Sequence, residues 1–326
     1  MTTPVYDQWI RKSSIVLVSN STSSAGTQEG ISISSDLRFT FFVTQADAQT
    51  YNSVRIRIYN LSDKTVAKLL GATGVEYTRV ILQAGYEHGA YGVIFDGTIK
   101  QYGHGRESNV TSYLDIFASN GDRLNSATIN TTVAAPVAWD GQVQAISNVV
   151  TPYGYNVKGH DEARSTGGVL PRGKVMYGSL ASHLRDLGQT RLTTWSVQGN
   201  TLVEIPLRGY LVGDVVVLNS QTGLLGTPQA TQNGITAMCL LNPKIVIGQR
   251  VKLNNRDINQ TIVKDRASFD PNPSALVMYA SEAADGIYRV CVHEIEGDTR
   301  GNPWYSHLVL LALDPSAAPE EAAKLS

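Results

Sequence analysis

Residues 53–71, SVRIRIYNLSDKTVAKLLG, constrain the fold more than any other stretch, because a strand pattern passes into a helix pattern within a few positions. In the first half, apolar side chains alternate with arginines and a tyrosine, as in a strand that is buried on one face only. The apolar positions are Val54, Ile56 and Ile58. We therefore expect a half-buried strand that ends near Asn60.

The second half predicts a short helix over residues 62–70. Ser62 is a favourable N-cap, and Gly71 suits the left-handed residue that commonly follows a helix. Its apolar stripe is formed by Val66, Leu69 and Leu70. Because a two-turn helix is unstable alone, we expect its apolar side to pack over an opening in the hydrophobic core.

Alternation recurs on both sides of this unit, which predicts an antiparallel β-barrel or sandwich with a helical cap over residues 1–124. Residues 36–43 and 112–119 each suit one strand, and 78–99 suit a hairpin with a glycine-rich turn. The polar stretch 19–30 is interpreted as a mobile loop.

Residues 125–206 change character and predict an α+β insert. Helical spacing runs from Trp139 to Val150, and a second helix is expected over 179–188 with Gly188 as its stop. Gly199 and Asn200 then join two strand-like stretches in a hairpin.

Strand patterns return over residues 207–313 and predict a second β-barrel. The chain as a whole is therefore predicted to be mainly β, with two antiparallel β-barrel domains that flank the α+β insert. No clear internal repeat supports a duplication. Residues 314–326 lose the periodicity and are interpreted as a flexible tail.

Composition excludes some classes of function. The net charge is −1 and charged residues make up 17% of the chain, which argues against a protein that coats nucleic acid. The N-terminus lacks an apolar signal segment, and no apolar run is long enough to span a bilayer, so we expect no membrane insertion. Cys239 and Cys291 each lie among apolar residues and are expected to be buried thiols rather than a disulfide.

Clusters that invite a catalytic interpretation have simpler explanations. In HEIEGD, residues 293–298, strand alternation separates His293 from Glu294 and Glu296. GHDEARS, residues 159–165, is expected to be a solvated loop, and GGVLPRGK lacks the spacing of a phosphate-binding loop. We therefore predict no catalytic residue, cofactor or metal, and no enzyme activity.

Tyrosine is frequent, with 15 residues against 6 phenylalanines. Tyrosine tolerates half-wet contact surfaces, so Tyr59, Tyr86, Tyr91 and Tyr102 suit an interface, a sugar-binding face or an ordinary polar exterior. The sequence leaves these three interpretations open.

Two stretches, SVRIRIYNLSDKTVAKL and VILQAGYEHGAYGVIFDGTIKQ, resemble the first barrel of the central baseplate hub of contractile-tailed bacteriophages. The residues that match its hairpin are Leu82, Ala84, Gly85, Tyr86, Ile94, Phe95, Gly97 and Ile99. Similar stretches follow at 223–254 and 286–312, so the resemblance covers most of residues 10–313 in order. Compared with the larger hubs, we expect reduced insert domains and no fused lysozyme-like segment.

The resemblance implies a structural virion protein whose barrels are like those of a tail tube. Three copies would form a pseudo-six-fold ring that joins the tail tube, or a distal tail protein, to a central spike protein. The ring would offer a channel to the tape measure protein and to DNA as passing cargo, with baseplate wedge proteins around it. Assembly would take place in the cytoplasm of the host bacterium.

Five residues are predicted to lie at interfaces of such a ring: Tyr59, Leu69, Leu70, Tyr86 and Phe95. The helix over 62–70 would cap one barrel and pack against the next subunit. Alternatives are another component with the tube fold, such as a distal tail or tube-terminating ring protein, and, less favoured, a tail-associated peptidoglycan hydrolase or a receptor-binding protein.

Overall fold

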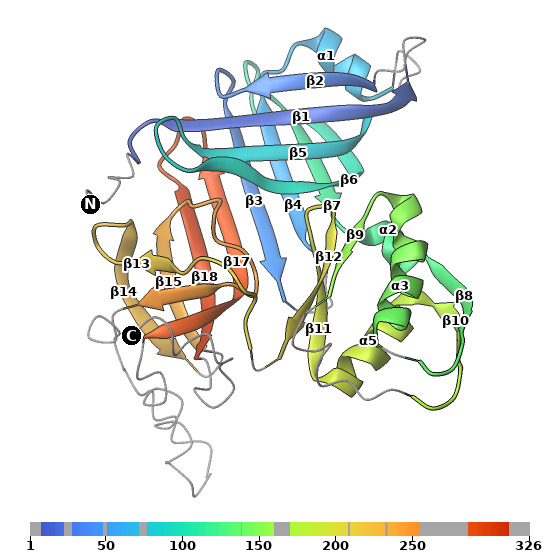
Figure 1. Ribbon diagram of the computed structural model, residues 1–326. Coiled ribbons are helices and arrows are strands. Elements are labelled where there is room, and N and C mark those ends of the chain that lie inside the picture. The colour runs from blue at the N-terminus through green and yellow to red at the C-terminus, as the bar shows by residue number, and fades with distance from the viewer. Residues whose placement is uncertain are drawn as a thin grey trace, which may run out of the picture.

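The computed structural model describes residues 8–22, 28–47, 51–71, 77–137, 139–159, 170–207, 209–231, 234–253 and 286–312 (Figure 1). The predicted tail over 314–326 and most of the predicted loop GHDEARS lie outside these ranges.

Strands dominate the described residues. The strands of the first region are β1 (Arg11–Thr22), β2 (Gln28–Ser34), β3 (Phe39–Ala46), β4 (Ser53–Tyr59), β5 (Tyr77–Tyr86), β6 (Tyr91–Arg106) and β7 (Ser112–Ser119). The later strands are β8 (Thr128–Val133), β9 (Asn156–Lys158), β10 (Lys174–Ser179), β11 (Thr193–Gln198), β12 (Thr201–Pro206), β13 (Val216–Leu218), β14 (Leu224–Thr231), β15 (Gly234–Leu240), β16 (Arg250–Leu253), β17 (Ile287–Asp298) and β18 (Trp304–Ala312). The helices are α1 (Asp63–Leu69), α2 (Asp122–Asn125), α3 (Trp139–Val150), α5 (Leu180–Arg191) and the 3-10 turn η1 (Thr151–Tyr153).

One sheet connects the two β-rich regions. Its strand order is β14-β15-β18-β17-β3-β4-β7-β6-β5-β1-β2, with β13 and β16 attached beside β17. The antiparallel pairing of β17 with β3 joins a C-terminal strand to an N-terminal one. The predicted mainly antiparallel β fold with an α+β insert is confirmed, and its two β-rich regions share one continuous sheet.

The strand and helix of residues 53–71 form as predicted. Val54, Ile56 and Ile58 are buried in β4. Ser62 is the N-cap of α1, and its hydroxyl accepts a hydrogen bond from the Thr65 amide. Gly71 has a φ of +85°, the left-handed conformation that ends such helices. In Figure 1, α1 lies beside β2 at the top of the first β-rich region.

The polar stretch 19–30 is mostly strand rather than a loop. β1 continues to Thr22 and β2 begins at Gln28, so two paired strands occupy much of that stretch. Hydrogen bonding between the two backbones, together with the pairing of β1 with β5, offsets the absence of an apolar alternation. The prediction failed because it considered side chains only.

The second helix of the insert is longer than predicted. α5 continues past Gly188 to Arg191 and ends at Leu192, whose φ is +56°. Gly188 is buried, and a Cβ there would lie 2.6 Å from the Thr193 carbonyl oxygen. Gly188 therefore permits a close approach between helix and strand and does not end the helix.

Three hydrophobic clusters form the core. The first comes mainly from residues 15–118 and also includes Leu241, Ile295 and Trp304. The second lies within residues 203–310, and the third within 124–202. Cys239 and Cys291 are buried free thiols, as predicted.

Candidate functional site

Three of the five predicted interface residues lie inside the chain's own core. Leu69, Tyr86 and Phe95 are each at most 3% exposed and belong to the first hydrophobic cluster. Burial raises the pKa of Tyr86 to about 12, which is consistent with a phenol removed from water. These three side chains therefore lie beneath the molecular surface and pack within the subunit.

The other two reach the surface. Leu70 follows α1 and is 49% exposed, and Tyr59 is half-buried under the Arg38 guanidinium, 4.7 Å from its ring centre. Leu70 therefore offers apolar surface beside the helix cap. An interface between subunits at this place stays a prediction.

Among the residues that the structure describes, the strands at the two ends of the large sheet pair on one side only. These are β2 and β14 in the strand order. β14 contains Pro228 and shifts register between Leu225 and Gln229, two features that blunt an edge. Unpaired backbone groups at such edges are suited to a strand from another chain.

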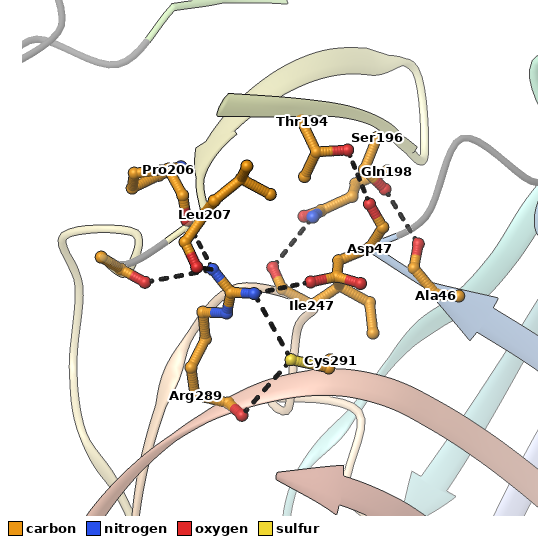
Figure 2. Close-up of polar contacts among 11 residues, drawn as sticks. Ala46, Asp47, Thr194, Ser196, Gln198, Pro206, Leu207, Ile247, Arg289 and Cys291 are labelled. Carbon is orange, nitrogen blue, oxygen red and sulfur yellow. Dashed lines mark hydrogen bonds and ion pairs between the residues drawn. The ribbon is translucent and has the colours of Figure 1, made fainter. Parts of the chain in front are cut away.

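A buried arginine marks the junction between the β regions and the insert (Figure 2). Arg289 of β17 is 3% exposed, and its Nη2 donates to the Asp47 carboxylate at 2.8 Å. Its Nη1 donates to the carbonyl oxygens of Pro206 and Leu207, at the end of β12. One side chain therefore contacts elements from the first region, the insert and the C-terminal region.

Cys291 lies beside this arginine, with its sulfur 3.5 Å from Nη2. Burial raises the pKa of the Cys291 thiol to about 11, although the Arg289 charge opposes the shift. The thiol is thus neutral and suited to packing rather than to nucleophilic chemistry.

Hydroxyl groups of β11 reinforce the same junction. Thr194 Oγ1 donates to the Asp47 carbonyl oxygen at 3.0 Å, and Ser196 Oγ donates to that of Ala46 at 3.3 Å. Figure 2 shows β11 lying against the end of β3 through these contacts. Polar contacts therefore hold the insert against the first β-rich region.

Side-chain amides make three further cross-links. Asn52 Nδ2 donates to the Val197 carbonyl oxygen at 2.7 Å. Asn120 Nδ2 donates to that of Gly199 at 2.8 Å, and Gln198 Nε2 to that of Ile247 at 2.9 Å. Since these groups are neutral, the cross-links do not depend on pH.

A cavity of about 350 Å³ lies between the same elements, and its walls include Asn52, Asn120 and Gln198. Asp96 also lines it, and this carboxylate accepts two hydrogen bonds from the Arg79 guanidinium, at 2.6 and 2.8 Å. The polar part of the wall thus consists largely of groups engaged in structural contacts.

His293 lines the cavity from β17 and is 1% exposed. Its Nε2 lies 2.9 Å from Ser306 Oγ, and burial lowers the pKa of the imidazole to about 4. As the alternation predicted, Glu294 and Glu296 lie on the opposite, more exposed face of the strand. His293 is therefore a neutral core residue at physiological pH.

The described ranges contain no group of three or more His, Cys, Asp or Glu side chains that could hold a metal ion. Among the same residues, no helix is long and apolar enough to cross a membrane. The absence of enzyme activity stays a prediction.

The sequence pattern did not indicate the junction residues. An arginine in the apolar stretch IYRVCV was the one available signal, because a charge rarely occupies a fully buried strand without a partner. The amides of Asn52, Asn120 and Gln198 carry no such signal, since asparagine and glutamine are ordinary surface residues.

No protein-family model matches the sequence, and no curated protein sequence matches it. Solved structures do match its fold. The 43 kDa tail protein of prophage MuSo2 from Shewanella oneidensis is 8% identical, with a TM-score of 0.53 over 92% of this chain and 96% of that one. A tail protein from Neisseria meningitidis MC58 is 9% identical, with a TM-score of 0.54 over 95% of this chain and 100% of that one.

The chain has the fold of phage tail proteins. The tail-protein fold also relates it to the E. coli c3393 protein, described as a component of the type VI secretion system with structural similarity to the T4 bacteriophage tail proteins gp27 and gp5. That protein is 8% identical, with a TM-score of 0.51 over 85% of this chain and 74% of that one. The resemblance noted in the sequence is thus confirmed at the level of fold.

Proposed function

We propose that the chain is a structural virion protein of the tail baseplate, the central hub of a contractile tail. In this proposal three copies form a ring around a channel and join the tail tube to a central spike. The tape measure protein and then DNA pass through the channel, and no chemical reaction is required of the chain.

One observation carries the proposal. The fold similarity extends over 92% and 95% of this chain and over nearly the whole of each of two tail proteins. A single tube barrel, as expected of a distal tail or tube-terminating protein, would leave much of this chain unmatched. The full-length match therefore favours a hub over those components.

The contacts within the chain are consistent with a subunit that withstands mechanical force. Arg289, the amide cross-links and the β3–β17 pairing fix the three parts of the chain to one another. Within the described residues, the end strand β2 pairs on one side only and leaves backbone groups for a neighbouring copy. A subunit whose parts are cross-linked and whose sheet has an open strand edge suits a ring.

The test is the mass of the purified protein, followed by imaging of the assembly. We expect particles of three copies of the 35.3 kDa chain with an open axis. Leu70→Asp should weaken the ring, because it places a charge in the exposed apolar surface beside α1. Val110→Asp, at an 84% exposed position on the β6–β7 turn, is the matched control.

A protein that stays monomeric under all conditions, or that cleaves peptidoglycan in a zymogram, would contradict the proposal. The second result would favour the tail-associated hydrolase. Specific binding to a cell-surface glycan would favour a receptor-binding protein instead.

A second candidate is a component of a type VI secretion system, which the similarity to c3393 favours. The aligned part spans 74% of that protein, against 96% and 100% of the two tail proteins. We therefore place the phage tail first.

A further inference from the structure

The large sheet has one face that turns away from the hydrophobic core. Along β3, β4 and β7, every second side chain is buried in the first hydrophobic cluster, and the side chains between them point the other way. We call this other side the outer sheet face, which the register with β3 continues onto β17. Its charged residues are Glu294, Glu296 and Asp298 on β17, Arg55 and Arg57 on β4, and Asp115 on β7.

The outer sheet face is open. Phe42 of β3 lies between Glu296 and Arg55 in the register and is 42% exposed, and the Glu296 side chain is 44% exposed. The strands β17, β3, β4 and β7 lie in the interior of the strand order, so each pairs on both sides and uses its backbone groups within the sheet. The face therefore presents side chains, and not backbone amides, to whatever lies outside the subunit.

Arg57 is held at the edge of its guanidinium and across its plane. Its Nε and Nη2 donate to the Asp115 carboxylate at 2.7 and 2.8 Å, and its Nη1 donates to Glu107 at 2.7 Å. The guanidinium carbon lies 4.2 Å from the ring centre of Tyr113. The hydrogen bonds from Arg57 lower the pKa of Asp115, so the pair stays charged.

Two further arginines repeat this arrangement. Arg55 Nη2 lies 3.4 Å from the Asp115 carboxylate, and its guanidinium carbon lies 5.5 Å from the ring centre of Phe117. Arg38, next to the face, donates to the Asp298 carboxylate at 2.9 Å and covers a tyrosine ring, as described above. A guanidinium that is paired at its edge and stacked on its plane has fewer donors left for a phosphate group.

Carboxylates outnumber arginines on this face, even when Arg38 is counted with it. In the register, Glu294 and Glu296 lie beside Thr44 and Phe42, which are uncharged. Glu296 Oε2 is 3.9 Å from His307 Nε2 on the next strand, β18. The outer sheet face therefore carries a net negative charge.

We propose that the outer sheet face lines the channel of the ring, and that its arginines are paired so that this wall does not retain DNA in transit. The inference rests on the proposed function, because the channel exists only in the ring. Free arginine or lysine side chains bind DNA by neutralising its phosphates. Paired arginines and an excess of carboxylates do not, and the carboxylates repel the phosphates.

The first test measures which reagents reach this face in the assembled ring. Thr44→Cys should react with a small maleimide but several-fold less with a bulky polymer-linked maleimide, which the channel excludes. Cys239 and Cys291 are the other thiols of the chain, and both are buried. Tyr177→Cys, 76% exposed on the insert, is the control and should react alike with both reagents. In Leu70→Asp subunits that do not assemble, Thr44→Cys should also react alike with both.

The second test releases the arginines. Asp115→Asn removes the carboxylate that holds Arg55 and Arg57, so rings of this variant should bind double-stranded DNA at least about tenfold more tightly than unchanged rings. The binding should weaken as salt is added. Asp186→Asn, which removes the same charge from an exposed position on α5, is the control and should not bind DNA more tightly.

A second variant guards against misfolding of Asp115→Asn. The double substitution Glu294→Lys and Glu296→Lys reverses two charges without breaking an arginine pair, and its rings should also gain salt-sensitive DNA binding.

Two results would overturn the proposal: rings in which the bulky reagent reaches Thr44→Cys as readily as the small one, or no gain of DNA binding in either charge variant. Both would leave the proposed function intact, because rings would still have formed. A protein that forms no ring would instead contradict the proposed function itself.

Discussion

Arg289 and Asp47 show how single residues hold this fold together. They lie 242 positions apart in the chain, yet their side chains meet at 2.8 Å in a largely buried junction. An arginine within an apolar strand is visible in the sequence, but its partner is not, because no local pattern links residues so far apart. The candidate site was therefore predictable only in part.

Arg289→Met should destabilise the protein by about 3 kcal/mol, because it leaves the Asp47 carboxylate and two carbonyl oxygens without their donor. Chemical denaturation measures the effect. Arg55→Met is the control: its contact with Asp115 is 3.4 Å long and its side chain is 55% exposed, so the change should be under about 1 kcal/mol. Equal losses of unfolding free energy in the two variants would show that the buried junction contributes no more than an exposed ion pair.

His293 gives a pH dependence of stability. Burial lowers its folded pKa from 6.5 to about 4, so between these values the unfolded chain binds a proton that the folded chain does not. Stability should therefore fall as the pH drops from 6.5 towards 4, by roughly 3 kcal/mol in all. Unfolding free energies measured across this range test the prediction.

His293→Gln should flatten that part of the profile, whereas the same change at His88, exposed in a turn, should leave it intact. A profile that keeps its slope without His293 would assign the pH dependence to other groups.

At the scale of elements, alternation was a reliable guide where one face of a strand is buried. β4 and α1 formed as their side chains indicated. The parts of β1 and β2 that fall within 19–30 were missed, because backbone pairing and not apolar alternation extends the strands there. The predicted end of α5 at Gly188 was wrong, because glycine also occurs where two backbones approach closely and not only where a helix stops.

Gly188→Ala should destabilise the protein by about 1–3 kcal/mol, although alanine is the better helix former. The added Cβ would lie 2.6 Å from the Thr193 carbonyl oxygen, and the backbone on both sides would have to move. Ser182→Ala, at an exposed position of the same helix, should be nearly neutral. Thermal unfolding of both variants makes the comparison, and a stabilised Gly188→Ala protein would contradict the close contact.

At the scale of the molecule, the continuous sheet could not be predicted from the sequence. The patterns indicated two β-rich regions but not that β17 would pair with β3. Ile295 and Trp304 come from the C-terminal region and pack into the first cluster. The boundaries at 124 and 206 stay a prediction: the first and second cores share the large sheet, and a polar junction joins the third core to them.

A chain of residues 1–124 alone should therefore fail to fold stably. It would expose the β3 edge that β17 covers and would lose Leu241, Ile295 and Trp304 from its core. Circular dichroism and thermal unfolding of this fragment test the prediction. A cooperative transition like that of the full chain would show an independent domain.

The central claim is that this chain builds a hollow ring in a phage tail, and a three-dimensional reconstruction of the assembled tail that contains it tests that claim most directly. The account predicts three copies around an open axis, between the tail tube and the spike. A single copy, a closed axis or a position outside the tail would contradict it.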